Sequence, residues 1–469
     1  MKYTLTLSEK HLVELKSLIL KEDGFERPAI LLCGRSLISN DIWDGGPECR
    51  FLSKEIIPIP ETDIKTNSKV AVNWNTSAFR LAMKKAAQGD LAICLVHSHP
   101  EGANSFSGID DENEADLFKT IYNRNTDDSP HLSLVITYDG TLFARACTKR
   151  LKYHPISMIR TIGDRFSFHY SDKYANFNRE EFNRQQLAFG KTLNNDLSKL
   201  RIGIIGCGAT GSASAHLLAR LGVGQLLLID NDLVERSNLS RLYGATSADA
   251  DAGRPKVEVL HNFITNIGIG CRVRLINDWV GSEKSRNALK SCDIILGCTD
   301  DNSGRVFLNR FAHFYLTPVI DMGIVIEPSK TEPNQIQALQ GRVTVIIPGS
   351  TCLLCRNAID RQLAREENLK RSDPLGFERQ KEEAYVVGSG NPSPAVITFT
   401  TEVASMAVNE LINRIIGFKR TPAENHIIRF FDKREDRRPG AKSQEGCPIC
   451  NNDAYWGKGD TEPFLDQTN

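Results

Sequence analysis

The stretch LVHSHPEGANSFSGIDDENEADL, residues 95–117, contains residue types that bind metals. His97 and His99 end an apolar run, and because alternate residues of a strand face the same side, both imidazoles can point to one place. Asp110 follows after a turn and would supply a third ligand. Two histidines and a carboxylate with an open fourth position are typical of a catalytic zinc site. Taken alone, S107-G-I-D110 is also a capping box at the start of a helix.

The full spacing distinguishes these two interpretations. H97-x-H99, seven further residues and then S107-x-x-D110 resembles the motif of the JAMM (JAB/MPN) zinc metalloproteases. The resemblance implies an α+β, cytidine-deaminase-like domain that cleaves behind the C-terminal tail of ubiquitin or ubiquitin-like proteins. It also implies that His97, His99 and Asp110 hold a catalytic Zn²⁺. Ser107 would then help to stabilise the oxyanion while capping the helix.

A general base is needed to take a proton from zinc-bound water, whose pKa the metal lowers to about 7. The resemblance implies a glutamate at or just before an early strand, and Glu26 in GFERPAILLCG fits. Glu22 is a nearby competitor. Pro28 and Ala29 replace the glycine pair that usually follows this glutamate.

A glycine-rich turn, G206-C-G208-A-T-G211, lies between a strand and a helix. Amides at a helix N-terminus can bind a phosphate. Asp230 closes the next strand, where acids that bind ribose lie. This pattern alone would indicate a dehydrogenase.

Further motifs indicate adenylate chemistry instead: IDNDLVERSNLSR, with Asp230, Asp232, Asn238 and Arg241; GRPK, with Lys256; CTDD, with Asp300; and FNRQQLAFG, with Arg184. Together they resemble the adenylyltransferase family that includes ThiF, MoeB and the ubiquitin-activating enzymes, over about residues 178–455. The resemblance implies a doubly wound, Rossmann-like domain in which a protein C-terminal carboxylate attacks the α-phosphate of ATP.

The same resemblance implies individual roles. Asp230 or Asp232 would bind ribose. The phosphates would lie against the glycine turn and three side chains, namely Asn238, Arg241 and Lys256. Asp300 would hold Mg²⁺, and Arg184 would reach the ATP of a second subunit, which implies a homodimer. The chain departs from the family pattern twice: Leu242 replaces a glutamine, and Asp301 replaces an asparagine and adds a negative charge near the nucleotide.

Two pairs, C352-L-L-C355 and C447-P-I-C450, have the spacing of a tetrahedral Cys₄ structural zinc site. The same pairs occur at corresponding places in the adenylyltransferase family. A disulfide is the alternative, but twelve cysteines in 469 residues are too sparse for a disulfide scaffold and indicate a reducing cytosol. We therefore expect a zinc clip that holds the C-terminal tail and performs no chemistry.

Ubiquitin-activating relatives place a thioester-forming cysteine after the first C-x-x-C, yet residues 356–446 contain no cysteine. Three routes stay open. The adenylate is handed directly to a partner, which we favour, or Ser372 or Ser389 forms an oxyester, or Cys207 or another cysteine outside the zinc clip serves as nucleophile.

Length and pattern predict domains at residues 1–155 (the metalloprotease), 156–195 (a linker with a helical arm) and 196–469 (the adenylyltransferase). We expect helices near 76–88 and 108–124, an exposed insertion at 356–391 and a long helix after it. Basic and acidic residues balance at 58 each, which argues against a nucleic-acid or membrane partner. No stretch is apolar for long enough to span a membrane.

These observations predict a bifunctional cytoplasmic enzyme that adenylates a separate ubiquitin-like protein and trims it or removes its conjugates. Such fusions resemble components of bacterial ubiquitin-like conjugation operons, some linked to phage defence, in which a conjugating enzyme would be a further partner. The alternative is activation and trimming of a sulfur-carrier protein for biosynthesis. A noncatalytic scaffold is opposed by the intact metal and nucleotide residues.

Overall fold

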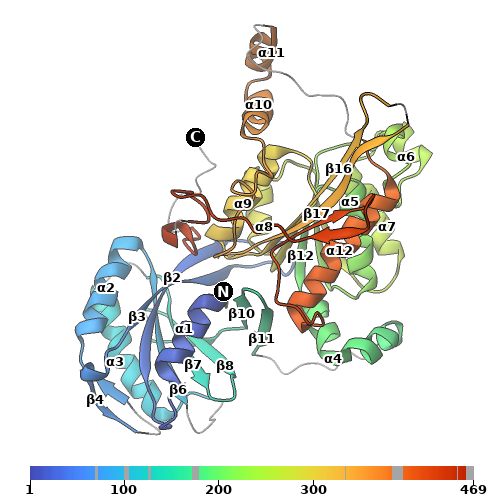
Figure 1. Cartoon of the computed structure of the whole chain (residues 1–469). Helices are drawn as coiled ribbons and strands as arrows, with labels where there is room; N and C mark the ends of the chain where they lie inside the picture. The colour runs from blue at the N-terminus through green and yellow to red at the C-terminus, as the bar shows by residue number, and fades with distance from the viewer. Residues whose placement is uncertain are drawn as a thin grey trace. The chain divides into compact units, whose positions relative to one another are not determined.

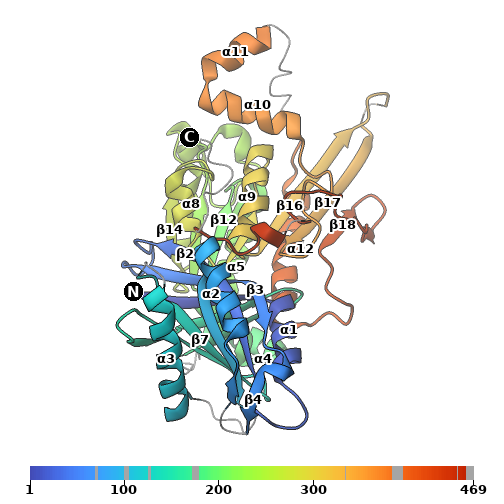
Figure 2. The same ribbon diagram turned by 90° about the vertical axis from the view of Figure 1, so that its left-hand side faces the viewer.

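The chain forms two compact units (Figures 1 and 2). The computed structural model describes residues 1–68, 72–99, 105–124, 128–171, 179–332, 334–382, 394–451 and 453–460. The N-terminal unit comprises Met1–Ala175, Phe314–Leu316 and Ala454–Asn469, and the C-terminal unit comprises Asn176–His313 and Thr317–Asp453. In the part of the chain so described, no helix is both long and apolar enough to cross a membrane.

The N-terminal unit is built on one mixed sheet with the strand order β11-β10-β1-β3-β2-β6-β7-β8-β9. Its strands are β1 (Lys2–Ser8), β2 (Pro28–Ile38), β3 (Glu48–Pro58), β6 (Ala92–His99), β7 (His131–Thr137), β8 (Leu142–Cys147), β9 (Tyr153–Pro155), β10 (Met158–Ile162) and β11 (Phe166–Tyr170). The short strands β4 (Ile64–Asn67) and β5 (Val72–Trp74) form a separate ribbon after the 3-10 helix η1 (Glu61–Asp63).

Both faces of this sheet are covered, because alternate residues of β2 belong to different apolar cores. Leu31 shares a core with Leu15 of α1 (Glu9–Ile19). Ile30 shares the other core with Phe79 of α2 (Ser77–Gly89) and Phe118 of α3 (Gly108–Arg124). The helices expected near 76–88 and 108–124 are therefore present, and they cover the same face.

Phe51 belongs to the apolar core that contains Leu15 of α1, and it is fully buried. We expect Phe51→Ala to lower the free energy of unfolding by about 3–5 kcal/mol, because truncation removes apolar contact and leaves a cavity. Val13→Ala on the exposed side of α1 is the matched control, and its effect should stay within about 0.5 kcal/mol. Urea unfolding monitored by circular dichroism measures both, and equal midpoints would contradict the assignment of Phe51 to this core.

Part of the predicted linker forms regular structure in this sheet. β10 pairs in parallel with β1, and β11 pairs antiparallel with β10. Both strands are only five residues long and include polar residues, Arg160 and Thr161 in β10 and Ser167 and His169 in β11, so their hydrophobic signal is weak. The pairing of β10 with the first strand of the chain brings together residues more than 150 positions apart, and local sequence does not encode such a contact.

The C-terminal unit contains a sheet with the order β14-β13-β12-β15-β16-β17-β18-β19. The strands from β14 to β16 run parallel, and those from β16 to β19 are antiparallel to their neighbours. Their bounds are β12 (Arg201–Ile205), β13 (Gln225–Ile229), β14 (Arg272–Ile276), β15 (Ile294–Gly297), β16 (Val319–Pro328), β17 (Ile336–Ile346), β18 (His426–Phe430) and β19 (Glu435–Arg437).

Helices follow the parallel strands, as a doubly wound α/β fold requires. Those that follow a parallel strand are α5 (Ala209–Arg220), α6 (Ser247–Asp251), α7 (Lys256–Asn266), α8 (Glu283–Leu289) and α9 (Asn302–Phe314), with the 3-10 turn η3 (Arg236–Asn238). α4 (Asn183–Lys199) follows the 3-10 turn η2 (Glu180–Phe182) and precedes β12, and α12 (Ile397–Ile416) lies between β17 and β18 in the chain. A further 3-10 turn, η4 (Asp453–Tyr455), begins at the last residue of this unit, and its other residues belong to the N-terminal unit. The predicted insertion contributes α10 (Arg361–Ser372) and α11 (Pro374–Glu382). Figure 1 shows α10 continuing into α11, away from the sheet.

Candidate functional site

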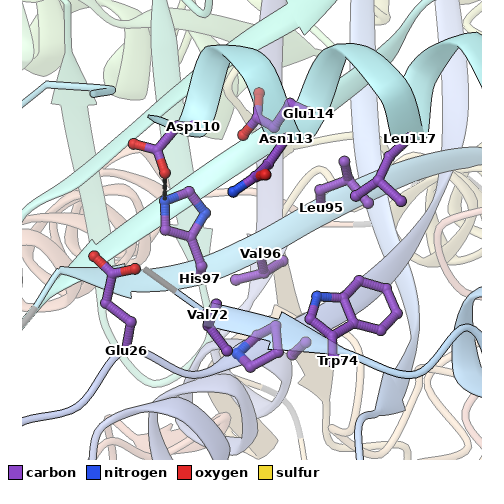
Figure 3. Close-up of a pocket in the computed structure, with 12 residues that line it drawn as sticks. Glu26, Val72, Trp74, Leu95, Val96, His97, Asp110, Asn113, Glu114 and Leu117 are labelled. Atoms are coloured by element: carbon purple, nitrogen blue, oxygen red, sulfur yellow. Dashed lines mark ion pairs between the residues drawn. The ribbon is translucent and has the colours of Figure 1, made fainter. Parts of the chain in front are cut away.

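The metal-binding residues predicted near residue 100 converge in the N-terminal unit. His97 Nε2 lies 3.1 Å from His99 Nε2 and 3.2 Å from Asp110 Oδ1, and His99 Nε2 lies 3.4 Å from Asp110 Oδ2. All three side chains are buried. The two histidines project from the end of β6 and the aspartate from the first turn of α3. Figure 3 shows His97 and Asp110 facing one another.

These distances fit a tetrahedral zinc ion. Ligands about 2.0–2.1 Å from such an ion lie about 3.3 Å from one another. The electrostatics agree, because hydrogen bonds from His97 and His99 outweigh the effect of burial and hold the pKa of Asp110 below its usual value. An ionised carboxylate beside two imidazoles is a donor set that suits zinc.

Ser107 performs the capping role that its spacing predicts. Its amide and hydroxyl donate to Asp110 Oδ2 at 2.7 and 2.8 Å, and Asp110 N–H donates back to Ser107 Oγ at 3.1 Å. The capping box and the metal motif are therefore compatible, because Asp110 Oδ1 is left to face His97. The cap orients the carboxylate toward the histidines.

Glu26 lies beside the histidines, with Oε1 3.9 Å from His99 Nε2. It precedes β2, whose Pro28 pairs with His97 of β6. Burial raises the pKa of Glu26 to about 7, against the lowering effect of His97 and His99. Glu22, the competing candidate, is exposed. A carboxyl group with a pKa near neutrality can both accept and donate a proton at physiological pH.

A partly buried ion pair beside the metal residues was not predicted from the sequence. Glu114, one helical turn after Asp110, accepts from Arg145 Nη2 at 2.7 Å and from Ser133 Oγ at 2.8 Å. Arg145 lies 3.9 Å from the ring centre of Phe106. Glu114 lines a pocket with Glu26, His97 and Trp74 (Figure 3). The i, i+4 spacing of two acids in a helix was the available signal.

The glycine turn has the geometry of a phosphate-binding loop. Gly206 has a φ of 86°, which other residues rarely adopt, and a Cβ on Gly211 would lie 1.8 Å from the Gly206 oxygen. Gly208 caps α5, and apart from its chain neighbours no described residue has an atom within 4 Å of the position its Cβ would occupy. The N-terminus of α5 therefore faces open space, as an anion site requires.

The predicted acids and lysine gather at the carboxyl edge of the parallel strands. Asp230 accepts from the Cys207 amide at 2.6 Å, and burial raises its pKa. Lys256 Nζ lies 2.7 Å from Asp232 Oδ2. Burial lowers the pKa of Lys256, but the charges of Asp230, Asp232 and Asp300 outweigh it and keep this pKa above its usual value. Lys256 is therefore a cation, and the exposed carboxylate of Asp300 is a hard oxygen donor that fits Mg²⁺.

Asn238 and Arg241 lie after β13 and are held by local contacts. Asn238 Oδ1 accepts from the Glu235 amide at 3.2 Å, and Arg241 Nη1 donates to the Ser237 carbonyl at 2.7 Å. Arg184 is exposed in the first turn of α4. No contact joins it to the other nucleotide residues among those described, so its role stays a prediction.

The four paired cysteines form one buried cluster. Cys352 Sγ lies 3.8 Å from Cys447 Sγ, and Cys355 Sγ lies 3.6 Å from Cys450 Sγ. Sulfur ligands about 2.3 Å from a tetrahedral zinc lie about 3.8 Å apart, whereas a disulfide requires about 2.05 Å. The cluster suits a structural zinc site.

The residues considered for a covalent intermediate differ in accessibility. Ser372 is exposed at the end of α10, where its hydroxyl donates to the Asn368 carbonyl at 2.9 Å. Ser389 lies outside the described residues. Cys207 is fully buried, and burial raises its pKa well above the usual value, so its thiol is a poor nucleophile.

The comparisons with known proteins identify both units. The model of the ThiF family matches residues 182–449, more than half of the chain, so the chain belongs to the ThiF family. Its N-terminal part matches the model of prokaryotic homologs of the JAB domain over residues 18–147. The predicted fusion of a JAB-like domain with a ThiF-like domain is therefore confirmed.

Individual relatives match parts of the chain. The sulfur carrier protein ThiS adenylyltransferase of Bacillus subtilis is 26% identical over 61% of this chain and 74% of its own. The SAMP-activating enzyme E1 of Haloferax volcanii is 26% identical over 33% of this chain, and the match spans only 52% of that relative. The ubiquitin-like modifier-activating enzyme 5 of Gallus gallus is 30% identical over 34% of this chain and 41% of its own.

Proposed function

We propose that the C-terminal unit adenylates the C-terminal glycine of a separate ubiquitin-like protein. The observation that carries the proposal is the cluster of the glycine turn, Lys256 and three acids at one edge of the parallel sheet. Membership of the ThiF family supports ATP as the substrate. Relatives named as activating a ubiquitin-like modifier, SAMP or a sulfur carrier support a small carrier protein as the second substrate.

In the proposed reaction, the carrier carboxylate attacks the α-phosphorus of ATP, and the bond to the β-phosphate oxygen breaks to release pyrophosphate. The amides of the Gly206–Gly211 turn and the Lys256 ammonium bind phosphate oxygens. Asp230 or Asp232 orients the ribose, and Asn238 and Arg241 contact the phosphates. Mg²⁺ held at Asp300 would supply charge neutralisation of the triphosphate. No protein nucleophile is required for this step.

We propose that the N-terminal unit is a zinc peptidase that trims the same carrier or removes its conjugates. Zinc held by His97, His99 and Asp110 would supply a water of lowered pKa. Glu26 would accept a proton from the attacking water and pass it to the leaving amine, and Ser107 would stabilise the oxyanion. The convergence of the three ligands and Glu26 supports this second activity.

Within this proposal the enzyme is a cytoplasmic homodimer in which Arg184 reaches the nucleotide of the second subunit. The carrier enters a conjugation pathway with a conjugating enzyme, and the bacterial systems linked to phage defence are the setting that the domain fusion favours. The absence of cysteine from residues 356–446 favours direct transfer of the adenylate.

A second candidate is activation and trimming of a sulfur carrier for biosynthesis. Its support is specific, since the ThiS adenylyltransferase match spans 61% of this chain, and the missing crossover cysteine is compatible with it. Isopeptide adducts on cell proteins would favour conjugation, whereas a thiocarboxylate at the carrier C-terminus would favour sulfur transfer.

Pyrophosphate exchange tests the adenylation. Purified chain is mixed with ATP, labelled pyrophosphate and each candidate ubiquitin-like protein from the same genome. We expect exchange with one candidate, and Asp300→Ala should lower it by at least about a hundredfold because a charge-neutralising ion loses its ligand. Glu283→Ala, which removes an exposed acid at the start of α8, is the matched control and should leave exchange unchanged. No exchange with any candidate would contradict the proposal.

A further inference from the structure

The insertion helix α10 contacts the start of α9, close in the chain to Asp300. Glu367 of α10 accepts from the backbone amides of Asn302, at 3.1 Å, and Ser303, at 2.7 Å. Asp360, at the start of α10, donates its amide to the Asn302 side chain at 2.9 Å. The insertion thus caps the first turn of α9, which begins two residues after the candidate magnesium ligand Asp300.

One helical turn beyond Glu367, Arg371 makes a second set of contacts with the same region. Its guanidinium lies 3.8 Å from the ring centre of Trp279. Its Nη2 lies 3.0 Å from Ser303 Oγ and 3.4 Å from Asp301 Oδ2. The Trp279 indole also donates to Asp301 Oδ2, at 3.3 Å. One carboxylate oxygen therefore meets both a cation and an indole N–H.

Asp301 is the residue at which this chain departs from the asparagine of the family pattern. Its other oxygen, Oδ1, accepts from the Gly304 amide at 2.6 Å and from Thr299 Oγ1 at 3.2 Å. An asparagine oxygen could make these same bonds, so capping α9 does not require the negative charge. A second carboxylate next to Asp300 would repel the triphosphate unless a cation compensates it.

We propose that Arg371 is a positioning residue of the nucleotide site, which neutralises Asp301 and holds α10 against the turn that carries Asp300. The inference rests on the proposed adenylation. It assigns a role to the insertion, because α10 carries the compensating cation 70 residues away in the chain. Asp301 and Arg371 act as a pair. If the positive charge of Arg371 is removed, removal of the negative charge of Asp301 should therefore restore ATP binding.

The test measures ATP binding to the full chain, with and without Mg²⁺, for Arg371→Met, Asp301→Asn and the double variant. We expect Arg371→Met to weaken MgATP binding by about fivefold, because a partly buried carboxylate is left uncompensated. Asp301→Asn in the Arg371→Met background should restore binding to within about twofold of the unmodified chain. Arg365→Met, which removes an exposed charge from the same helix, is the matched control and should bind ATP normally.

The outcomes separate the inference from the proposed function. Unchanged MgATP binding in Arg371→Met, with binding intact in the unmodified chain, would overturn the pairing alone. A double variant as weak as Arg371→Met would also overturn it, since a merely structural role for Arg371 predicts no rescue. No ATP binding by the unmodified chain would contradict the proposed function and the inference together.

Discussion

Glu26→Gln is expected to lower peptidase activity by about a thousandfold, because the amide cannot accept a proton from the attacking water. Glu26 Oε1 lies 3.9 Å from His99 Nε2. Glu26 lies just before the start of β2, which pairs with the part of β6 that carries the histidines. Glutamine has nearly the same volume, so the fold and the metal ligands should be undisturbed. Bound zinc should therefore equal that of the unmodified chain.

The measurement uses the carrier identified by pyrophosphate exchange, extended at its C-terminus by a short peptide, and follows release of that peptide. Glu22→Gln is the matched control because Glu22 is exposed and only four positions away in the chain. It should cleave normally. Full activity in Glu26→Gln, or a loss in Glu22→Gln of the same size, would contradict the assignment of the base. His97→Ala should lose zinc as well as activity, which separates metal binding from proton transfer.

The convergence of His97, His99 and Asp110 was predictable because it depends almost entirely on local geometry. His97 and His99 share a strand face by alternation, and Asp110 follows in the first turn of the next helix. The distance of Glu26 from His99 depends instead on the pairing of β2 with β6, across about 70 residues. Spacing could indicate a glutamate before a strand. Spacing alone does not predict the register of the β2–β6 pairing, and this register brings the glutamate to the histidines.

The glycine turn and the residues after β13 were also predictable, because a strand, turn and helix in sequence form one βαβ unit. The Arg371–Asp301 contact was not, since it joins an insertion helix to a distant turn. Its only sequence signal was the departure of Asp301 from the family pattern. Strands β10 and β11 were missed for a similar reason, because β10 depends on pairing with the distant strand β1, and β11 in turn pairs with β10.

Loss of the cysteine cluster should have the largest effect on stability. Structural zinc in small domains contributes an apparent 10–16 kcal/mol, roughly, and one missing thiolate removes much of that. Cys352 and Cys447 belong to segments separated by 95 residues in the chain, and the cluster joins them. We expect Cys352→Ala to lose the zinc of this site and to lower the unfolding midpoint of the C-terminal unit sharply.

Cys271→Ala is the matched control, because Cys271 belongs to the same unit and lies outside the cluster. Its cost should be about 1 kcal/mol. The decisive measurement combines bound zinc with thermal unfolding in the presence and absence of a chelator. The chelator should lower the midpoint of the unmodified chain and of Cys271→Ala, but not that of Cys352→Ala, which has already lost this ion. An equal chelator response in all three proteins would show that the cluster does not depend on a metal.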